Sequence, residues 1–161
     1  MEMNFVRDER RNRTIVQFDD ARIIWPNFRG KGDTFNRPGD RNFTLVIPNM
    51  EMAEALKEEG YNVKVSPPRD EGEEPFIKLL VKVRFNEYGP KIYLQTNGNR
   101  RLLTEDTVGM LDKIDISSID LDIRPYKWER PDGSSGTSAY LQGALVVQEL
   151  DRFGAYSEYE E

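Results

Sequence analysis

The chain has 161 residues, enough for one domain with a continuous core, and its formal net charge is -6. It contains no cysteine and no histidine, which excludes disulfides, thiolate zinc sites, cysteine nucleophiles and imidazole bases. No apolar run approaches the roughly 20 residues needed to cross a bilayer. These features favour an intracellular binding protein that is not an enzyme and needs no cofactor.

The first half of the chain predicts an arm, several strands and one helix. Residues 1–13 are charged and lack apolar periodicity, so we expect a flexible charged arm before a domain spanning residues 14–150. Residues 14–18, 21–28 and 42–47 are rich in β-branched and aromatic side chains and predict strands, whereas residues 29–40 predict a loop. Asn49 caps a predicted helix over residues 50–59 that ends at Gly60, and residues 61–65 predict a short strand.

The second half predicts longer strands. After an acidic loop at residues 66–75, residues 76–85 alternate between apolar and basic side chains, and residues 91–96 continue the pattern up to an Asn97-Gly98 turn. Thr104 caps a second short helix through residue 111, and residues 116–128 and 137–150 predict two strands joined by a turn. Many strands with one or two short helices favour a mainly β protein built as a small barrel, because closure limits exposed edges. An α+β sandwich is the alternative.

Strand alternation sorts the second half of the chain into two faces. The apolar face, which is the expected core, comprises Ile77, Leu79, Val81, Val83, Ile92, Leu94, Leu121, Ile123, Leu141, Leu145 and Val147. The polar face mixes cations with aromatic rings and comprises Lys78, Lys82, Arg84, Lys91, Tyr93, Gln95, Arg124, Tyr126, Trp128, Tyr140 and Gln142. Single-stranded nucleic acid explains this mixture, because unpaired bases stack on aromatic rings while cations follow the phosphates. Alternatively, these aromatics cover a second small core or meet the N-terminal arm.

A glycine-rich segment at residues 28–37 adds further candidates. It mixes cations and aromatic rings with glycines that let a backbone approach a ligand closely. The segment lacks the features of a nucleotide-binding P-loop, in which a strand is followed by Gly-x-x-x-x-Gly-Lys-Ser/Thr and then by a helix. We therefore do not expect nucleotide binding. The candidate contact residues in and before this loop are Trp25, Phe28, Lys31, Phe35 and Arg37.

Two rival interpretations remain open. Asp120 and Asp122 share one strand face and resemble the acidic pairs that hold Mg²⁺ in nucleases, although no motif supplies a separate base. Solvated strand carboxylates explain the pair more simply. The aromatic face could also serve as a protein-interaction surface.

Several separated segments resemble one family. They are ARIIWPNFRGKG at residues 21–32, FNR at 35–37, GDRNF at 39–43, GYNVK at 60–64, VKVRF at 81–85, PKI at 90–92 and DIRPYKW at 122–128. Together they resemble the single-stranded DNA-binding proteins of bacteriophages from Gram-positive, especially actinobacterial, hosts. The resemblance covers residues 21–150. It implies an OB-like (oligonucleotide-binding) fold, sequence-tolerant coating of single-stranded DNA during phage DNA replication and recombination, and a place in the host cell cytoplasm.

The charge is also distributed unevenly along the chain. Residues 22–43 carry five cations against two carboxylates, whereas residues 149–161 carry five carboxylates against one arginine. Residues 151–161 resemble the acidic tails with which single-stranded DNA-binding proteins recruit replication and recombination partners. We expect such a tail to compete with DNA for the basic surface of its own chain. Simple solubilisation is the alternative.

Overall fold

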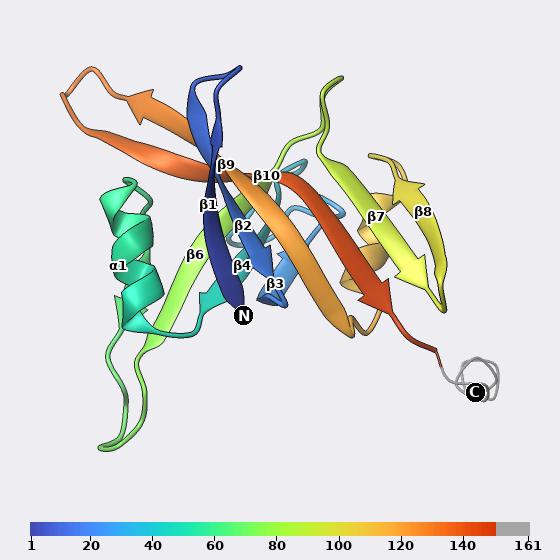
Figure 1. The fold of residues 1–161 in the computed structure, drawn as a ribbon, viewed down its shortest axis with the longest axis horizontal. Helices are drawn as coiled ribbons and strands as arrows, with labels where there is room; N and C mark the ends of the chain where they lie inside the picture. The colour runs from blue at the N-terminus through green and yellow to red at the C-terminus, as the bar shows by residue number, and fades with distance from the viewer. Residues whose placement is uncertain (151–161) are drawn as a thin grey trace.

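The computed structural model describes residues 1–150, and the predicted acidic tail at residues 151–161 lies outside the described residues. The described part holds ten strands, one α-helix and one 3-10 helix, η1 (Figure 1). In chain order these elements are β1 (Glu2–Asp8), β2 (Arg13–Asp19), β3 (Arg22–Asn27), β4 (Arg41–Ile47), α1 (Met50–Glu58), β5 (Lys64–Ser66), β6 (Phe76–Val83), β7 (Lys91–Thr96), β8 (Asn99–Leu103), η1 (Val108–Asp112), β9 (Ser118–Glu129) and β10 (Ser135–Gln148).

All ten strands belong to one mixed sheet in which β10 occupies the central position. The main path is β1-β2-β9-β10-β6-β4-β3, with β5 beside β6 and with β7 between β10 and β8. One edge of β10 pairs antiparallel with β9, while the other edge pairs in parallel with β6 and then with β7. Figure 1 shows β9 and β10 as two long diagonal strands whose hairpin extends beyond the rest of the sheet. The predicted mainly β class is confirmed, but no closed barrel is detected among the pairings of residues 1–150.

The N-terminal residues differ from the prediction of a flexible arm. Strand β1 pairs antiparallel with β2 over seven consecutive residues, from Glu2 opposite Asp19 to Asp8 opposite Arg13. Met1 and Met3 pack against the core, whereas Phe5 and Val6 stay partly exposed. A strand at the edge of a sheet is exposed to solvent on much of its surface. Its sequence therefore lacks the apolar alternation that marks a half-buried strand.

Local signals are confirmed where a few neighbouring residues decide the structure. The Asn49 side chain accepts a 2.9 Å hydrogen bond from the Met52 backbone N–H and caps α1. Asn97 and Gly98 both have positive φ and form the tight turn between β7 and β8. The second predicted helix, capped by Thr104 and running through residue 111, is replaced by the 3-10 helix η1 over Val108–Asp112, whose N-cap residue is Thr107 and makes no side-chain capping hydrogen bond. Strand β8 over Asn99–Leu103 was not predicted. Within residues 1–150, no helix is long and apolar enough to cross a membrane.

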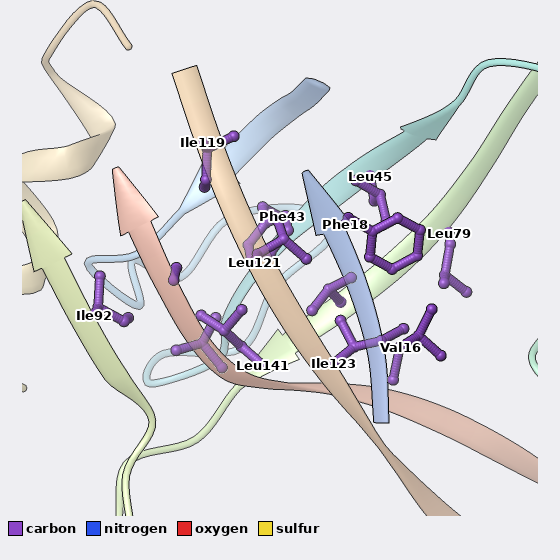
Figure 2. Packing of buried hydrophobic residues seen from close by; sticks show 14 of the residues in the cluster. Val16, Phe18, Phe43, Leu45, Leu79, Ile92, Ile119, Leu121, Ile123 and Leu141 are labelled. Atoms are coloured by element: carbon purple, nitrogen blue, oxygen red, sulfur yellow. The ribbon is translucent and has the colours of Figure 1, made fainter. Parts of the chain in front are cut away.

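The core lies between the strands of the main path and matches the apolar face except near the end of β10. Figure 2 shows side chains from β2, β4, β6, β9 and β10 meeting around Phe18, Phe43 and Leu121. The register of β10 against β9 shifts between Leu141 and Gly143. Beyond this β-bulge Ala144 and Val146 are buried, and the predicted core residues Leu145 and Val147 are only partly buried. The extra residue in the bulge reverses which side chains face inward.

Candidate nucleic-acid interface

Three strands bring a tyrosine pair and two cations together on the outer face of the sheet. Tyr140 on β10 lies opposite Lys82 on β6 and opposite Arg124 on β9. The Lys82 ammonium lies 6.0 Å from the Tyr140 ring centroid, and the Arg124 guanidinium carbon lies 5.0 Å from it. Tyr126 meets Tyr140 edge to face with centroids 5.6 Å apart and is 53% exposed. The predicted mixture of cations and rings on one face is therefore a real cluster in space.

A second group of aromatic and basic side chains lies farther along β6. Trp25 on β3 is 62% exposed, and its ring meets Phe76 edge to face at 6.2 Å. The Lys78 ammonium lies 5.3 Å from the Trp25 ring centroid. Leu80 lies between Lys78 and Lys82 on the same side of β6 and is exposed. This row continues to Arg84, so the path from Lys78 to Arg84 is about 20 Å long at 3.3 Å per residue.

We call these two groups and their extension on β9 the basic–aromatic face, comprising Trp25, Lys78, Leu80, Lys82, Arg84, Arg124, Tyr126, Trp128 and Tyr140. Sequence reasoning did not identify Leu80 as a member of this face, or Phe76 as the ring that packs against Trp25. The signal was present for Leu80, because strand alternation places it between two lysines on the polar side. Leu80 was not assigned to the polar face because its side chain is apolar.

Trp128 lies on the β9–β10 hairpin, two residues beyond Tyr126 on the same side of the strand. It pairs with Gly136, where a Cβ atom would come within 2.6 Å of the Trp128 ring. The indole therefore packs closely against Gly136, where a larger residue would not fit. The Arg130 guanidinium carbon lies 4.9 Å from the ring centroid of Trp128. Trp128, a predicted stacking residue, therefore follows Tyr126 along β9 and has Arg130 against its ring.

The glycine-rich loop contains one residue whose predicted role is corrected. Phe28 is only 1% exposed and stacks on Phe43 with centroids 5.5 Å apart, so it is a core residue and cannot stack on a base. Contacts within the loop itself also explain why glycine occupies two of its positions. A Cβ on Gly30 would lie 3.2 Å from Gly39 Cα, and one on Gly32 would lie 2.8 Å from Pro38 Cγ. Close approach of the loop to itself, without a ligand, explains both positions.

The same loop presents Phe35 to solvent beside the sheet. The Asp33 carboxylate accepts 2.7 Å hydrogen bonds from the backbone N–H groups of Phe35 and Asn36, and these bonds lower the pKa of Asp33. Asn42 on β4 donates a 2.8 Å hydrogen bond to the Asn36 side chain, which attaches the turn to the sheet. Phe35 is 94% exposed and lines one pocket together with Lys82, Arg84 and Tyr140. The loop thus brings another exposed ring to the basic–aromatic face.

The remaining candidates lie apart from this cluster. Lys91 and Tyr93 are on β7, opposite Gly143 and Leu145 in the second half of β10. Lys31 and Arg37 are exposed on the loop and do not line the pocket that contains Phe35. No contact among the described residues joins these four residues to Tyr140. Their predicted role in binding stays a prediction.

One of the two carboxylates of the rival interpretation, Asp120, has a structural role. The Asp120 carboxylate accepts a 2.8 Å hydrogen bond from the backbone N–H of Asp20, a residue with positive φ at the corner between β2 and β3. Burial raises the pKa of Asp122, and Asp19 and Asp120 raise it further. Among residues 1–150, no three acidic side chains are grouped as ligands for a metal ion. Asp120 therefore supports the sheet corner.

Comparison with solved structures shows the same fold in proteins of low sequence similarity. The single-stranded DNA-binding protein from bacteriophage Enc34 matches with a TM-score of 0.54 and 13% identity over 97% of this chain and 99% of that chain. The structure of that protein in complex with single-stranded DNA matches with a TM-score of 0.54 and 15% identity over 87% and 89% of the respective chains.

Sequence comparison identifies the family. No curated protein matches the chain. One family model matches residues 6–157, which include nearly all of the ten strands and the whole basic–aromatic face. The chain therefore belongs to the family described as "Putative phage ssDNA-binding domain".

Proposed function

We propose that this protein coats single-stranded DNA in a sequence-tolerant way, with the strand lying along the basic–aromatic face. The observation that carries the proposal is the Tyr140 ring, which two cations flank and a second tyrosine meets edge to face on the outer side of the sheet. Family membership and the fold shared with a phage single-stranded DNA-binding protein support the same ligand.

The chemistry follows from the two kinds of side chain. Tyr126, Trp25 and Phe35 offer exposed ring surfaces to bases, and Tyr140 offers a partly exposed one. Each stacked base contributes about 1–3 kcal/mol regardless of its identity. Lys78 and Lys82 on β6, and Arg84 directly after it, follow the phosphates. The face selects single strands, because the base faces of a duplex are already stacked on one another. Sequence-tolerant coating of this kind serves phage DNA replication and recombination, in which single strands are exposed.

We further infer that the central strands form an OB-like, partly open barrel. Strands β2 and β3 are separated only by Asp20 and Ala21, and the Ala21 N–H donates a 2.8 Å hydrogen bond to the Ile119 carbonyl on β9. If β2 and β3 count as one bent strand, the path β2/β3-β4-β6-β10-β9 returns to β2. Five strands in this order, with β6 and β10 parallel over only two residue pairs, support a five-stranded barrel with one weak seam.

The proposal is tested by titrating intrinsic tryptophan fluorescence with oligo-dT, oligo-rU and duplex DNA at one salt concentration. Trp25 is exposed beside Lys78, so a strand bound along β6 changes its emission. We expect tight binding of oligo-dT and weak binding of the duplex. Equal affinity for both would leave only a general phosphate-binding surface and contradict the stacking mechanism. No binding to any of the three would favour the protein-interaction alternative.

A further inference from the structure

A pocket that borders the basic–aromatic face at Arg124 gathers arginines from segments far apart in the chain. The turn between β1 and β2 contributes Arg11, the first residue of β2 contributes Arg13, the β6–β7 connection contributes Tyr88 and Pro90, and β9 contributes Arg124. Arg13 donates a 3.3 Å hydrogen bond to the Gln142 side chain at the bulge of β10, which attaches the N-terminal hairpin to this region. The pocket exists because residues 2–19 form a paired hairpin.

The positive charge of the pocket is only partly neutralised. Arg13 forms a 3.3 Å ion pair with Asp8. Among the ion pairs of residues 1–150, none includes Arg11 or Arg124. Burial lowers the pKa of Arg124, and the nearby cations Arg13, Arg11 and Arg84 lower it further, against the opposing effect of Tyr140. An anion in this position would relieve repulsion between like charges.

Tyr88 adds a ring surface to the arginines. It is 70% exposed, and the Arg11 guanidinium carbon lies 5.6 Å from its ring centroid. The Asn86 side chain accepts a 2.8 Å hydrogen bond from the Tyr88 backbone N–H, and Asn86 and Gly89 exchange backbone hydrogen bonds at 2.8 and 3.2 Å. These bonds hold the tight loop from which the ring projects. A cation beside an exposed ring repeats the chemistry of the basic–aromatic face.

We propose that this pocket, the Arg11–Tyr88 subsite, binds the continuation of the DNA strand that lies on the basic–aromatic face, with a phosphate at Arg11, Arg13 and Arg124 and a base on Tyr88. The inference rests on the proposed function. Arg124 connects the two regions, because it contacts the Tyr140 ring and also lines the pocket. With this subsite, the DNA-binding path extends from the basic–aromatic face past the β-bulge of β10 to Tyr88.

The test compares Arg11→Gln and Tyr88→Ala with Arg10→Gln, a control of matched charge. Arg10 is an exposed residue of the same turn and does not line the pocket. Affinity is measured by anisotropy for labelled oligo-dT of increasing length, from about 4 to about 16 nucleotides, the range that single OB folds cover. Circular dichroism checks that each variant folds. The wild-type protein must gain affinity with length until the path is filled.

For short oligonucleotides we expect both variants to match the wild type, because the basic–aromatic face alone binds them. For long oligonucleotides Tyr88→Ala should weaken binding roughly 5- to 150-fold, the equivalent of one stacked base. Arg11→Gln should flatten the slope of log K against log salt by about 0.7, the value for one single-strand phosphate contact. Arg10→Gln should behave as the wild type at every length.

Three results would overturn the subsite while leaving the proposed function intact. In the first, both variants bind oligo-dT of every length with wild-type affinity. In the second, they lose as much affinity for short oligonucleotides as for long ones. In the third, Arg10→Gln loses as much affinity as Arg11→Gln. If the wild-type protein binds no oligo-dT of any length, the proposed function and the subsite fail together. The length series therefore distinguishes the two failures.

Discussion

The outer sides of the two halves of β9 and β10 carry opposite charges. On one side of the β-bulge, Arg124 lies beside Tyr140 and Lys82. On the other side, Asp120 and Asp122 lie near Asp19 on β2, and the pKa of Asp122 is raised by burial and by these two neighbours. The sign of the charge changes between positions 122 and 124 of one strand. A net charge of -6 therefore conceals a local cationic face, and position on the sheet decides what the surface can bind.

The opposed halves also suggest a direction for the DNA strand. The acidic half repels phosphates, so a strand that leaves Tyr140 is directed toward β6 or toward the Arg11–Tyr88 subsite. Lys91 and Tyr93 on β7 border the acidic half, since Lys91 lies opposite Gly143, which in turn lies opposite Asp122. Three predictions test this comparison.

The largest expected effect separates the two tyrosine positions. Tyr140→Ala removes a ring that contacts Tyr126, Lys82 and Arg124, and it should weaken oligo-dT binding by about 1–3 kcal/mol. Tyr93→Ala, in the acidic half, should cost less. Anisotropy with labelled oligo-dT measures both, and thermal unfolding confirms that each variant is folded. A loss for Tyr93→Ala as large as for Tyr140→Ala would place the strand along β7.

A smaller effect concerns single cations. Lys82→Ala removes one phosphate contact and should flatten the slope of log K against log salt by about 0.7. Lys91→Ala makes the same change of charge in the acidic half, across β10 from Asp122, and should alter the slope less, because the local field there is acidic. Binding measured between about 0.05 and 0.2 M salt gives both slopes. Identical slopes for the two variants would show that the acidic half does not direct the DNA.

The smallest effect is on stability and depends on pH. Because the pKa of Asp122 is raised in the folded protein, the folded state holds this proton more tightly than the unfolded chain, and ionisation lowers the free energy of unfolding as pH rises. Asp122→Asn should therefore stabilise the protein modestly at pH 7. The gain should disappear as pH falls below the ordinary value of 3.8, where the carboxyl is neutral in both states.

Urea unfolding of the wild type and Asp122→Asn across this pH range measures the difference. Asp132→Asn is a useful contrast, because hydrogen bonds from Ser134 lower the pKa of Asp132 and that variant should lose stability at pH 7. A gain for Asp122→Asn that persists unchanged at low pH would mean that packing, and not charge, is responsible.

Prediction from sequence succeeded where neighbours in the chain decide the geometry and failed where distant partners do. Alternation placed Lys82, Arg124 and Tyr140 on one face of the sheet, as the structure has them, because side-chain direction in a regular strand follows from the position of the residue. Phe28 was misassigned, since nothing in the loop sequence shows that its ring stacks on Phe43. Sequence reasoning assigned Arg11 and Arg13 to a flexible N-terminal arm, because a solvent-exposed hairpin at a sheet edge lacks an apolar pattern.

The sequence by itself determined the mainly β class, the Asn49 cap, the Asn97-Gly98 turn and the mixed character of the outer face, since each depends on side chains within one strand or turn. Only the tertiary structure decided which members of that face meet. The bulge after Leu141 reverses the inward-facing side of β10, and the pairing of β10 with β6, β7 and β9 separates a cationic half from an acidic half. The physical reason is that register and strand order depend on contacts between residues far apart in the chain, which alternation along one strand does not encode.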